Sequence, residues 1–259
     1  MNIHPTAIID PSAVLHESVK VGPYSIIEKG VEIGENTEVS SCVRIYANVK
    51  IGKSNKFYHN TVIGCDPQDL SFDQSTVTIL QIGDNNVFRE GVHISRSTNP
   101  EIVMKIGNQN LLMSNTHIGH DCSMGNGCIF ASTASIGGHV KMGNKIFVSA
   151  LTGVHQFCQI GDYAMAAGLG KITNDIPPYC TADGNPAVII GLNVVGLRRA
   201  GFSSETRREI QNAYKVIYHS RFVTSKAVEE LKKKTDRIPE VDNIIRFFES
   251  SKRGVTDHA

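Results

Sequence analysis

The stretch "VKVGPYSIIEKGVEIGENTEV", residues 19–39, decides the fold, because an apolar residue returns in it at every sixth position. Those positions are Val21, Ile27, Ile33 and Val39. The same period runs through residues 3–63 and, displaced by one, through residues 82–172, where only Pro100 fails. Glycine commonly follows the apolar residue, and the residue four places after it is small or branched. Chance would give such regularity with odds on the order of 10^-9, so it marks an internal repeat.

A period of six fits neither an α-helix nor a simple alternating strand. It fits a short strand followed by a corner, with the apolar residue and the small or branched one pointing inward. Glycine near a corner permits unusual backbone angles or close approach of two chains. Three such faces close one coil, and successive coils stack in parallel at about 4.8 Å. The sequence therefore predicts a mainly β fold, a parallel β-helix. The period does not decide its hand, and crossover rules alone favour the right hand.

Two segments interrupt the repeat and are expected to leave the prism as surface loops. They are "CDPQDLSFDQSTVTILQ", residues 65–81, and "STNPEIVMK", residues 97–105. Such loops commonly carry binding groups. After Pro177 and Pro178 the repeat fades, and three helical segments follow at residues 203–221, 225–236 and 239–251, the first with Ser203 or Ser204 as a plausible N-cap. We expect a β-helix over residues 1–190 and a helical domain over 191–259 that covers the last coil.

Composition excludes several classes of function. The 26 basic and 25 acidic side chains nearly balance, so binding to nucleic acid is not indicated. The six cysteines form no CxxC pair, which favours reduced thiols, and Cys122 and Cys158 occupy inward positions of the repeat. The chain starts without a secretory signal, and no stretch has the roughly 20 apolar residues of a membrane-spanning helix. We therefore expect a cytoplasmic protein without membrane insertion.

Several histidines fall on consecutive coils if each coil has three six-residue faces. "HIGHDC" then stacks on "IGGHV", and that segment stacks on "GVHQF". The residues expected to converge are His117, His120, Asp121, Gly138, His139, His155 and Gln156. One chemistry is general-base catalysis by a single imidazole, with the others binding polar groups of a substrate. Another is a zinc centre like that of a β-helical carbonic anhydrase, although that enzyme pairs histidines five apart and "HIGH" pairs them three apart. A non-catalytic binding scaffold is the third reading.

Several motifs together resemble the UDP-N-acetylglucosamine acyltransferases of lipid A biosynthesis. They are "NTHIGHDCSMGNGC", "IGGHVKMG", "GVHQFCQIGDYAM", "DIPPYCTADGNPA", "GLNVVGLRRAGFS" and "IQNAYKVIY". The resemblance runs almost from end to end. It implies a left-handed β-helix, a homotrimer with sites between subunits, and no metal or cofactor. It also implies the first step of lipid A biosynthesis, in which a 3-hydroxyacyl chain passes from acyl carrier protein to the 3-position of a UDP-GlcNAc-type sugar.

The resemblance also implies roles for particular residues. His120 would be the general base, Asp121 would fix its tautomer, and the backbone N–H of Gly138 would bind the oxyanion. The residues expected to bind substrate are Gln68, Asp69, His117, His139, His155, Gln156, Asn193, Arg198 and Arg199. Three positions depart from the common pattern of the family, namely Ser71, Val195 and Ala200. Some relatives acylate a 3-amino sugar, so N-acylation stays an alternative.

The acyl chain is expected to lie along the prism, past an acyl-chain ruler formed by Met165, Gly168, Leu169 and Lys171. Leu169 and Lys171 are bulky, and overpacking opposes a long chain, which suggests a donor of about 12 carbons. A segment of this chain, residues 196–237, complements the acidic carrier protein in charge. It contains 11 lysines and arginines and 5 acids, a local excess of 6 positive charges.

Overall fold

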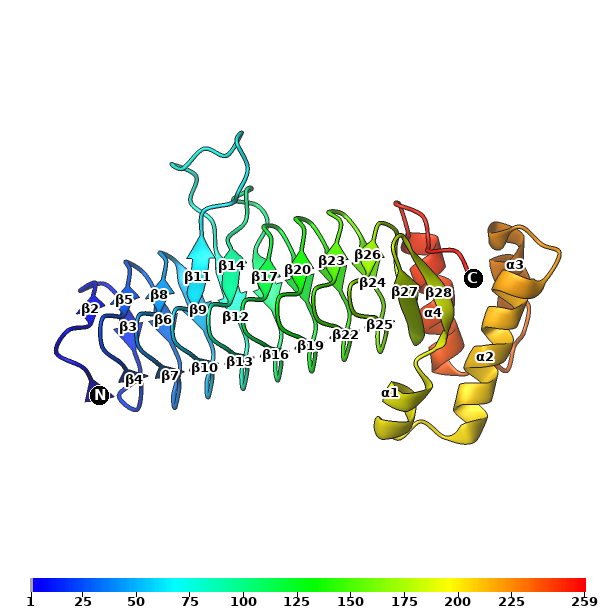
Figure 1. The fold of residues 1–259 in the computed structure, drawn as a ribbon, viewed down its shortest axis with the longest axis horizontal. Helices are drawn as coiled ribbons and strands as arrows, with labels where there is room; N and C mark the ends of the chain where they lie inside the picture. Colours follow the sequence, from blue (N-terminus) through cyan, green and yellow to red (C-terminus); the bar gives the residue numbers. More distant parts are fainter. Residues whose placement is uncertain (1) are drawn as a thin grey trace.

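The computed structural model describes residues 2–259, which form a long three-sided prism followed by a small helical end (Figure 1). The faces of the prism are three sheets, here called A, B and C, and the chain visits them in that order in every coil. Sheet A contains β1 Asn2–Ile3, β4 Lys20–Val21, β7 Glu38–Val39, β10 Lys56–Phe57, β13 Val87–Phe88, β16 Leu111–Leu112, β19 Ile129–Phe130, β22 Phe147–Val148, β25 Met165–Ala166, β27 Cys180–Gly184 and β28 Ala187–Leu192. Sheet B contains β2 Ile8–Ile9, β5 Ile26–Ile27, β8 Arg44–Ile45, β11 Val62–Cys65, β14 His93–Ser95, β17 His117–Ile118, β20 Ser135–Ile136, β23 Gly153–Val154 and β26 Lys171–Ile172. Sheet C contains β3 Val14–Leu15, β6 Glu32–Ile33, β9 Val49–Ile51, β12 Leu80–Ile82, β15 Met104–Ile106, β18 Ser123–Met124, β21 Lys141–Met142 and β24 Gln159–Ile160.

The predicted inward residues form the core of the prism. Pairing within each coil sheet is parallel, and most partners are 18 residues apart, as Ile118 and Ile136 are. Both residues are fully buried, and so are residues of the second inward position such as Thr116 and Ala134. Phe57 and Phe88 stack inside the prism with ring centroids 4.8 Å apart. Burial of each such side chain contributes about 1.5–3 kcal/mol, so the repeat stabilises the fold coil by coil. The predicted parallel β-helix is confirmed.

The corners divide two tasks between two positions of the repeat. The glycine that follows the apolar residue is needed for close approach. A Cβ added to Gly22 would lie 2.7 Å from the carbonyl carbon of Ser40 on the next coil. The left-handed backbone conformation falls two residues later, for example at Asn36 and Asn48, with φ of 57° and 60°. Asparagine tolerates this conformation better than most residues. Both expected roles of corner glycines are seen, close approach at the residue after the apolar one and the left-handed conformation at Gly30, Gly91 and Gly127, with φ of 67°, 68° and 66°.

Both predicted loops leave the prism, and both are slightly shorter than expected. Residues 66–79 connect β11 to β12 and rise well above the prism, and residues 96–103 connect β14 to β15 (Figure 1). Leu80 and Met104, placed in loops by the sequence, begin strands. The second loop lengthens its coil, so that His93 pairs with His117, 24 residues away.

The C-terminal part contains the three predicted helices and three elements that were not predicted, namely two strands and a short first helix. The antiparallel hairpin of β27 and β28 extends sheet A, because β27 pairs with β25. The helices are α1 Val194–Arg199, α2 Ser204–His219, α3 Thr224–Lys232 and α4 Pro239–Ser250. Ser203 caps α2 by accepting a hydrogen bond from the Thr206 N–H, as expected. The hairpin, rather than a helix, covers the edge of sheet A. No helix among residues 2–259 is long and apolar enough to cross a bilayer.

Candidate active site

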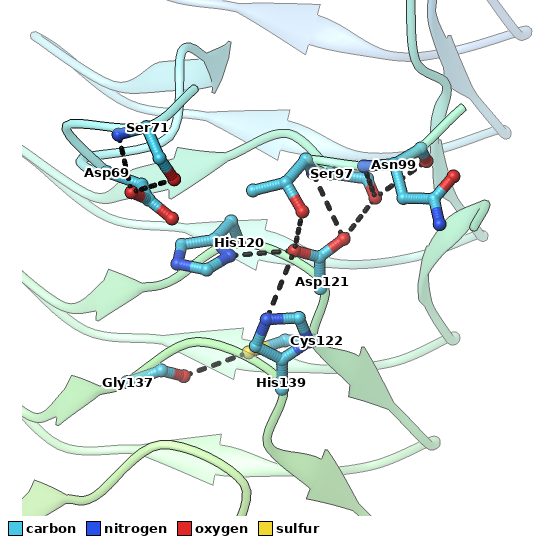
Figure 2. A network of polar contacts seen from close by, with 10 residues as sticks. Asp69, Ser71, Ser97, Asn99, His120, Asp121, Cys122, Gly137 and His139 are labelled. Atoms are coloured by element: carbon cyan, nitrogen blue, oxygen red, sulfur yellow. Dashed lines mark hydrogen bonds and ion pairs between the residues drawn. The ribbon is translucent and has the colours of Figure 1, made fainter. Parts of the chain in front are cut away.

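The candidate site lies at the corner between sheets B and C, in the middle of the prism. Asp121, His139 and Phe157 occupy the left-handed position of three successive coils, with φ of 57°, 61° and 67°. This conformation costs about 1–2 kcal/mol for an L-residue, so the neighbouring coils must hold it in place. It turns the three side chains out of the corner, one above another. Figure 2 shows Asp121 and His139 facing His120.

Asp121 is the most firmly held group of the site. Its carboxylate accepts hydrogen bonds from the Ser97 hydroxyl and from both the N–H and the hydroxyl of Thr98, the latter two at 3.1 and 2.8 Å. It also accepts from His120 Nδ1 at 2.7 Å. Burial by itself would raise the pKa of Asp121, but these hydrogen bonds outweigh it and hold the pKa below 3.8. Asp121 is therefore a carboxylate at neutral pH, fixed by the loop of residues 96–103.

His120 is oriented by Asp121 on one side and by Gly138 on the other. Because Asp121 accepts from Nδ1, the neutral imidazole carries its proton there, which leaves Nε2 with a free electron pair. A Cβ added to Gly138 would lie 2.6 Å from both Nε2 and Cε1 of His120. The ring thus rests against the backbone of Gly138, where any other residue would displace it. The N–H of Gly138 donates to no backbone carbonyl in the described chain.

His139 joins the pair, whereas His155 and Gln156 do not. The His139 ring meets His120 edge to face with centroids 5.1 Å apart, and its Nε2 lies 3.6 Å from Asp121 Oδ2. On the next coil His139 stacks on Phe157 at 4.5 Å. His155 Nδ1 instead contacts the carbonyl of Gln156, and both of these residues are exposed. Gln156 still lies on the adjacent coil, since a Cβ added to Gly137 would lie 2.7 Å from its backbone nitrogen, so a substrate contact by His155 and Gln156 stays a prediction. The left-handed corner position directs Phe157, rather than its predecessors, toward the cluster.

His117 belongs to a second cluster that the sequence reasoning missed. His93 pairs with His117 across β14 and β17, and their Nδ1 atoms lie 3.0 Å apart. His93 Nε2 lies 3.0 Å from the sulfur of Cys65, which is buried. Burial lowers the pKa values of His93 and His117, and for His117 the nearby histidines His93 and His120 add to this effect. A count that allowed for the extra six residues of this coil would have found His93.

The first loop brings one of its two predicted residues close to the histidines. Figure 2 shows Asp69 and Ser71 on the same side of the corner as His120. Asp69 accepts hydrogen bonds from the N–H and hydroxyl of Ser71, which lower its pKa, with smaller contributions from His120 and His139. Gln68 is exposed in the same loop. Ser71, a departure from the family pattern, thus orients Asp69 locally.

The predicted nucleotide contacts lie beyond the last coil. The Asn193 side chain caps α1 by accepting from the Gly196 N–H at 3.0 Å, and it donates to the Tyr163 carbonyl at 2.9 Å. Arg198 and Arg199 are exposed in the last turn of α1. Since His120 directly follows β17 in mid-prism, a single chain keeps these arginines away from it (Figure 1).

The predicted ruler residues divide between two faces. Lys171 lies on sheet B next to Gly153, which lies next to Ser135, and Ser135 pairs with His117. Ser135 and Gly153 are small, and a Cβ on Gly153 would meet nothing within 4 Å. The outward row on sheet B from His117 to Lys171 thus has small residues in its middle. Leu169 is 71% exposed at the adjoining corner.

The other ruler residues are less well placed on this face. Gly168 lies at the same corner as Leu169, but Met165 lies on sheet A, between Phe147 and Thr181. Met165 is therefore not part of the outward row on sheet B.

A cleft of about 620 Å³ opens on the sheet C side of the corner between sheets B and C. Asp121 and His139 lie at one side of it, and Phe157 adds an apolar surface. Its remaining lining residues include Ile102, Val103, Lys141, Lys252 and Arg253. The cleft thus joins an apolar wall, three cations and the His–Asp cluster.

His120, Asp121 and His139 could also approach a metal ion, since one ligand atom from each lies within 4.8 Å of the others. Both oxygens of Asp121, however, already accept hydrogen bonds, and His120 Nδ1 is one of the donors. A cation would have to displace those donors. The arrangement suits proton transfer better than metal binding.

Comparison with known families first identifies the class of protein. The family described as "Bacterial transferase hexapeptide (six repeats)" matches residues 12–47 and 104–138. The family described as "Udp N-acetylglucosamine O-acyltransferase; Domain 2" matches residues 175–256. The repeat and the C-terminal part therefore both indicate a hexapeptide-repeat acyltransferase.

Relatives of known name narrow the class to one family. Proteins of Alkalilimnicola ehrlichii and Janthinobacterium sp. (strain Marseille), both named acyl-acyl-carrier-protein–UDP-N-acetylglucosamine O-acyltransferase, are 48% and 45% identical to this chain, with 98% of each chain covered. The crystal structure of UDP-N-acetylglucosamine O-acyltransferase from Moraxella catarrhalis superposes with a TM-score of 0.95 at 41% identity, covering 99% of this chain and 100% of that one. The chain belongs to the UDP-N-acetylglucosamine O-acyltransferase family and is an acyltransferase.

Proposed function

We propose that this chain transfers a 3-hydroxyacyl group from acyl carrier protein to the 3-hydroxyl of UDP-N-acetylglucosamine, the first step of lipid A biosynthesis, with His120 as general base. The observation that carries the proposal is the 2.7 Å contact between His120 Nδ1 and Asp121 Oδ2. It leaves the Nε2 electron pair of His120 free, while the backbone of Gly138 packs against the ring at an outer corner of the prism. The family membership supports the substrates.

His120 supplies what a sugar hydroxyl lacks. Near neutral pH a hydroxyl is a poor nucleophile, and an imidazole can take its proton as the new bond forms. Nε2 of His120 takes that proton while the sugar oxygen attacks the thioester carbonyl carbon. The carboxylate of Asp121 stabilises the imidazolium that results. General-base assistance of this kind contributes about 10^2–10^4 to the rate.

Gly138 serves the other half of the reaction. The carbonyl oxygen becomes an oxyanion in the tetrahedral intermediate, and the Gly138 N–H donates a hydrogen bond to it. Collapse of the intermediate breaks the carbon–sulfur bond, and the departing thiolate takes the proton from His120. The ester and the free thiol of the carrier protein are the products, and the base is regenerated.

The other predicted contacts fit an acceptor held between two subunits. Asp69 and His117 lie near His120, but Arg198 and Arg199 lie on α1 beyond the last coil. Guanidinium groups suit a diphosphate, so a neighbouring copy would have to supply them. We therefore propose a homotrimer with its sites between subunits. The exposed cations of residues 196–237 are the proposed docking surface for the acidic carrier protein.

The test is acyl transfer from a panel of carrier-linked 3-hydroxyacyl chains to UDP-GlcNAc and to its 3-amino analogue. The proposal expects faster turnover of UDP-GlcNAc, loss of turnover in His120→Ala with retained sugar-nucleotide binding, and a steep fall of the rate with added salt. Preference for the amino sugar would replace O-acylation by N-acylation at the same site. Unchanged turnover in His120→Ala would reject the general base. Stoichiometric zinc needed for turnover would favour the metal reading.

A further inference from the structure

Cys65 and His93 have no part in the reaction as proposed above, yet together with His117 they form a series of ring and thiol contacts. The sulfur of Cys65 lies 3.0 Å from His93 Nε2, and His93 Nδ1 lies 3.0 Å from His117 Nδ1. The two rings also stack, with centroids 5.1 Å apart and planes at 27°. Such contacts fix both rotation and proton position.

The proton positions follow from the chemistry of the partners. Two Nδ1 atoms at 3.0 Å require that one carries a hydrogen and the other an electron pair. Burial raises the pKa of Cys65 and lowers the pKa values of His93 and His117, so the thiol and both rings are neutral near neutral pH. Each neutral ring then has one donor and one acceptor nitrogen.

The hydrogen of the Cys65 thiol determines which nitrogen of each ring donates and which accepts. Cys65 lies closer to His93 Nε2, at 3.0 Å, than to the Ile94 carbonyl at 3.6 Å or the Ser95 hydroxyl at 3.9 Å. If S–H donates to His93 Nε2, His93 carries its proton on Nδ1 and donates it to His117 Nδ1. His117 must then carry its own proton on Nε2, the nitrogen that has no protein partner among the described residues.

We infer that Cys65 and His93 are positioning residues, which lock His117 in the tautomer that presents Nε2–H as a hydrogen-bond donor to an oxygen of the sugar nucleotide. This inference rests on the proposed function for the identity of the ligand. His117 and His120 thereby have complementary roles in hydrogen bonding and proton transfer. His120 has a ring nitrogen that accepts a proton, and His117 has one that donates a hydrogen bond.

The direct test is the tautomer of His117, read by NMR from the two-bond proton–nitrogen correlations of ring-labelled histidines in the full-length protein. His117→Asn identifies the signal. The expected result is the Nε2–H tautomer in the wild type and a mixture of both tautomers in His93→Phe, which keeps the ring stack but removes the nitrogens. A wild-type His117 that carries its proton on Nδ1 would overturn the inference.

Steady-state kinetics give the second readout. In His93→Phe the KM for the sugar nucleotide should rise about tenfold, as for the loss of one good hydrogen bond, while kcat changes little. His93→Asn, whose amide can donate from the position of Nδ1, should restore most of the affinity. Cys65→Ala should raise KM less, about threefold, and Cys65→Ser should stay near wild type.

His59→Phe is the matched control, since His59 is exposed and the hydrogen bonds of its ring within the described chain are to Ser41. Equal KM values in His93→Phe, His59→Phe and wild type would reject the positioning role. If even the wild type fails to turn over UDP-sugars, the proposed function fails, while the tautomer measurement still decides the proton arrangement.

Discussion

Two corners of the prism use the same position of the repeat in opposite ways. At the corner between sheets C and A, the second residue after the apolar one is Asp84, Asn108, Asn126, Asn144 and Asp162 on successive coils. We call these five residues the outer polar ladder. At the corner between sheets B and C, the same position holds His120, Gly138 and Gln156.

Along the outer polar ladder each side chain satisfies its neighbour. Asn126 Oδ1 accepts from the N–H and the side-chain amide of Asn108 at 2.7 and 3.0 Å, and Asn144 Oδ1 does the same for Asn126 at 3.0 and 3.2 Å. At the other corner, Gly138 removes the side chain that would continue such a series. His120 therefore lies over a vacant rung and keeps a nitrogen free. One missing side chain thus distinguishes the corner proposed to be reactive from the structural one.

The largest effect is expected when an asparagine, as found in the outer polar ladder, replaces the residue at the same position of the corner between sheets B and C. His120→Asn should lower kcat by about 10^2–10^4 because it removes the base. Thermal unfolding should stay close to wild type, since asparagine is native to this position at the other corner. A variant that retains its turnover would contradict the assignment of His120.

Asp121→Asn should lower kcat by about a hundredfold, because the amide no longer stabilises an imidazolium. It should also change the acid side of the stability curve. The pKa of Asp121 is lower in the folded protein than its unfolded value near 3.8, so the carboxylate stabilises the fold above pH 3.8 and this contribution is lost as the pH falls through the folded pKa. Unfolding followed from neutral pH downward should show a weaker acid dependence in the variant. An identical dependence would show that another group is responsible.

Two glycine substitutions separate activity from stability. Gly138→Ala places a Cβ 2.6 Å from the His120 ring, which can turn aside, so kcat should fall about tenfold with little loss of stability. Gly119→Ala places a Cβ 2.8 Å from the backbone of Gly137 and Gly138, which cannot move freely, so unfolding should become easier by about 1–3 kcal/mol. Calorimetry and turnover of both variants are the measurement. The reverse pattern would place the role of Gly138 in folding.

Asn126→Ala tests the structural corner. It removes the acceptor of Asn108 and should lower the free energy of unfolding by about 1 kcal/mol, since the position is exposed. The kcat should not change. A fall in kcat would mean that the two corners are coupled.

The smallest effect is expected for the proposed acyl-chain ruler on sheet B. Lys171→Ala and Leu169→Ala should shift the preferred acyl chain toward greater length by a few-fold in relative kcat/KM, because they remove bulk from the end of the outward row that begins at His117. Met165→Ala is the comparison variant on sheet A and should leave chain preference unchanged. An unchanged profile in Lys171→Ala would remove the ruler.

The repeat predicted the prism because its inward positions are set by local chemistry alone. It did not predict which outward residue of a corner projects toward a neighbour, since that depends on the left-handed position that Phe157 occupies. The stack of Phe157 on His139 was therefore missed. His93 was missed because the second loop changes the length of its coil. The hairpin of β27 and β28 lies where the six-residue repeat has ended, so the period could not predict it.

Residues 96–103 leave the prism after sheet B and rejoin it at sheet C. The inward positions of the repeat therefore do not include them. Yet the hydroxyls of Ser97 and Thr98 within this loop donate hydrogen bonds to Asp121, the residue that orients His120. Substitutions in this loop would therefore change the environment of the proposed base without changing any inward side chain of the repeat. Reactivity and foldability would then evolve on separate stretches of sequence.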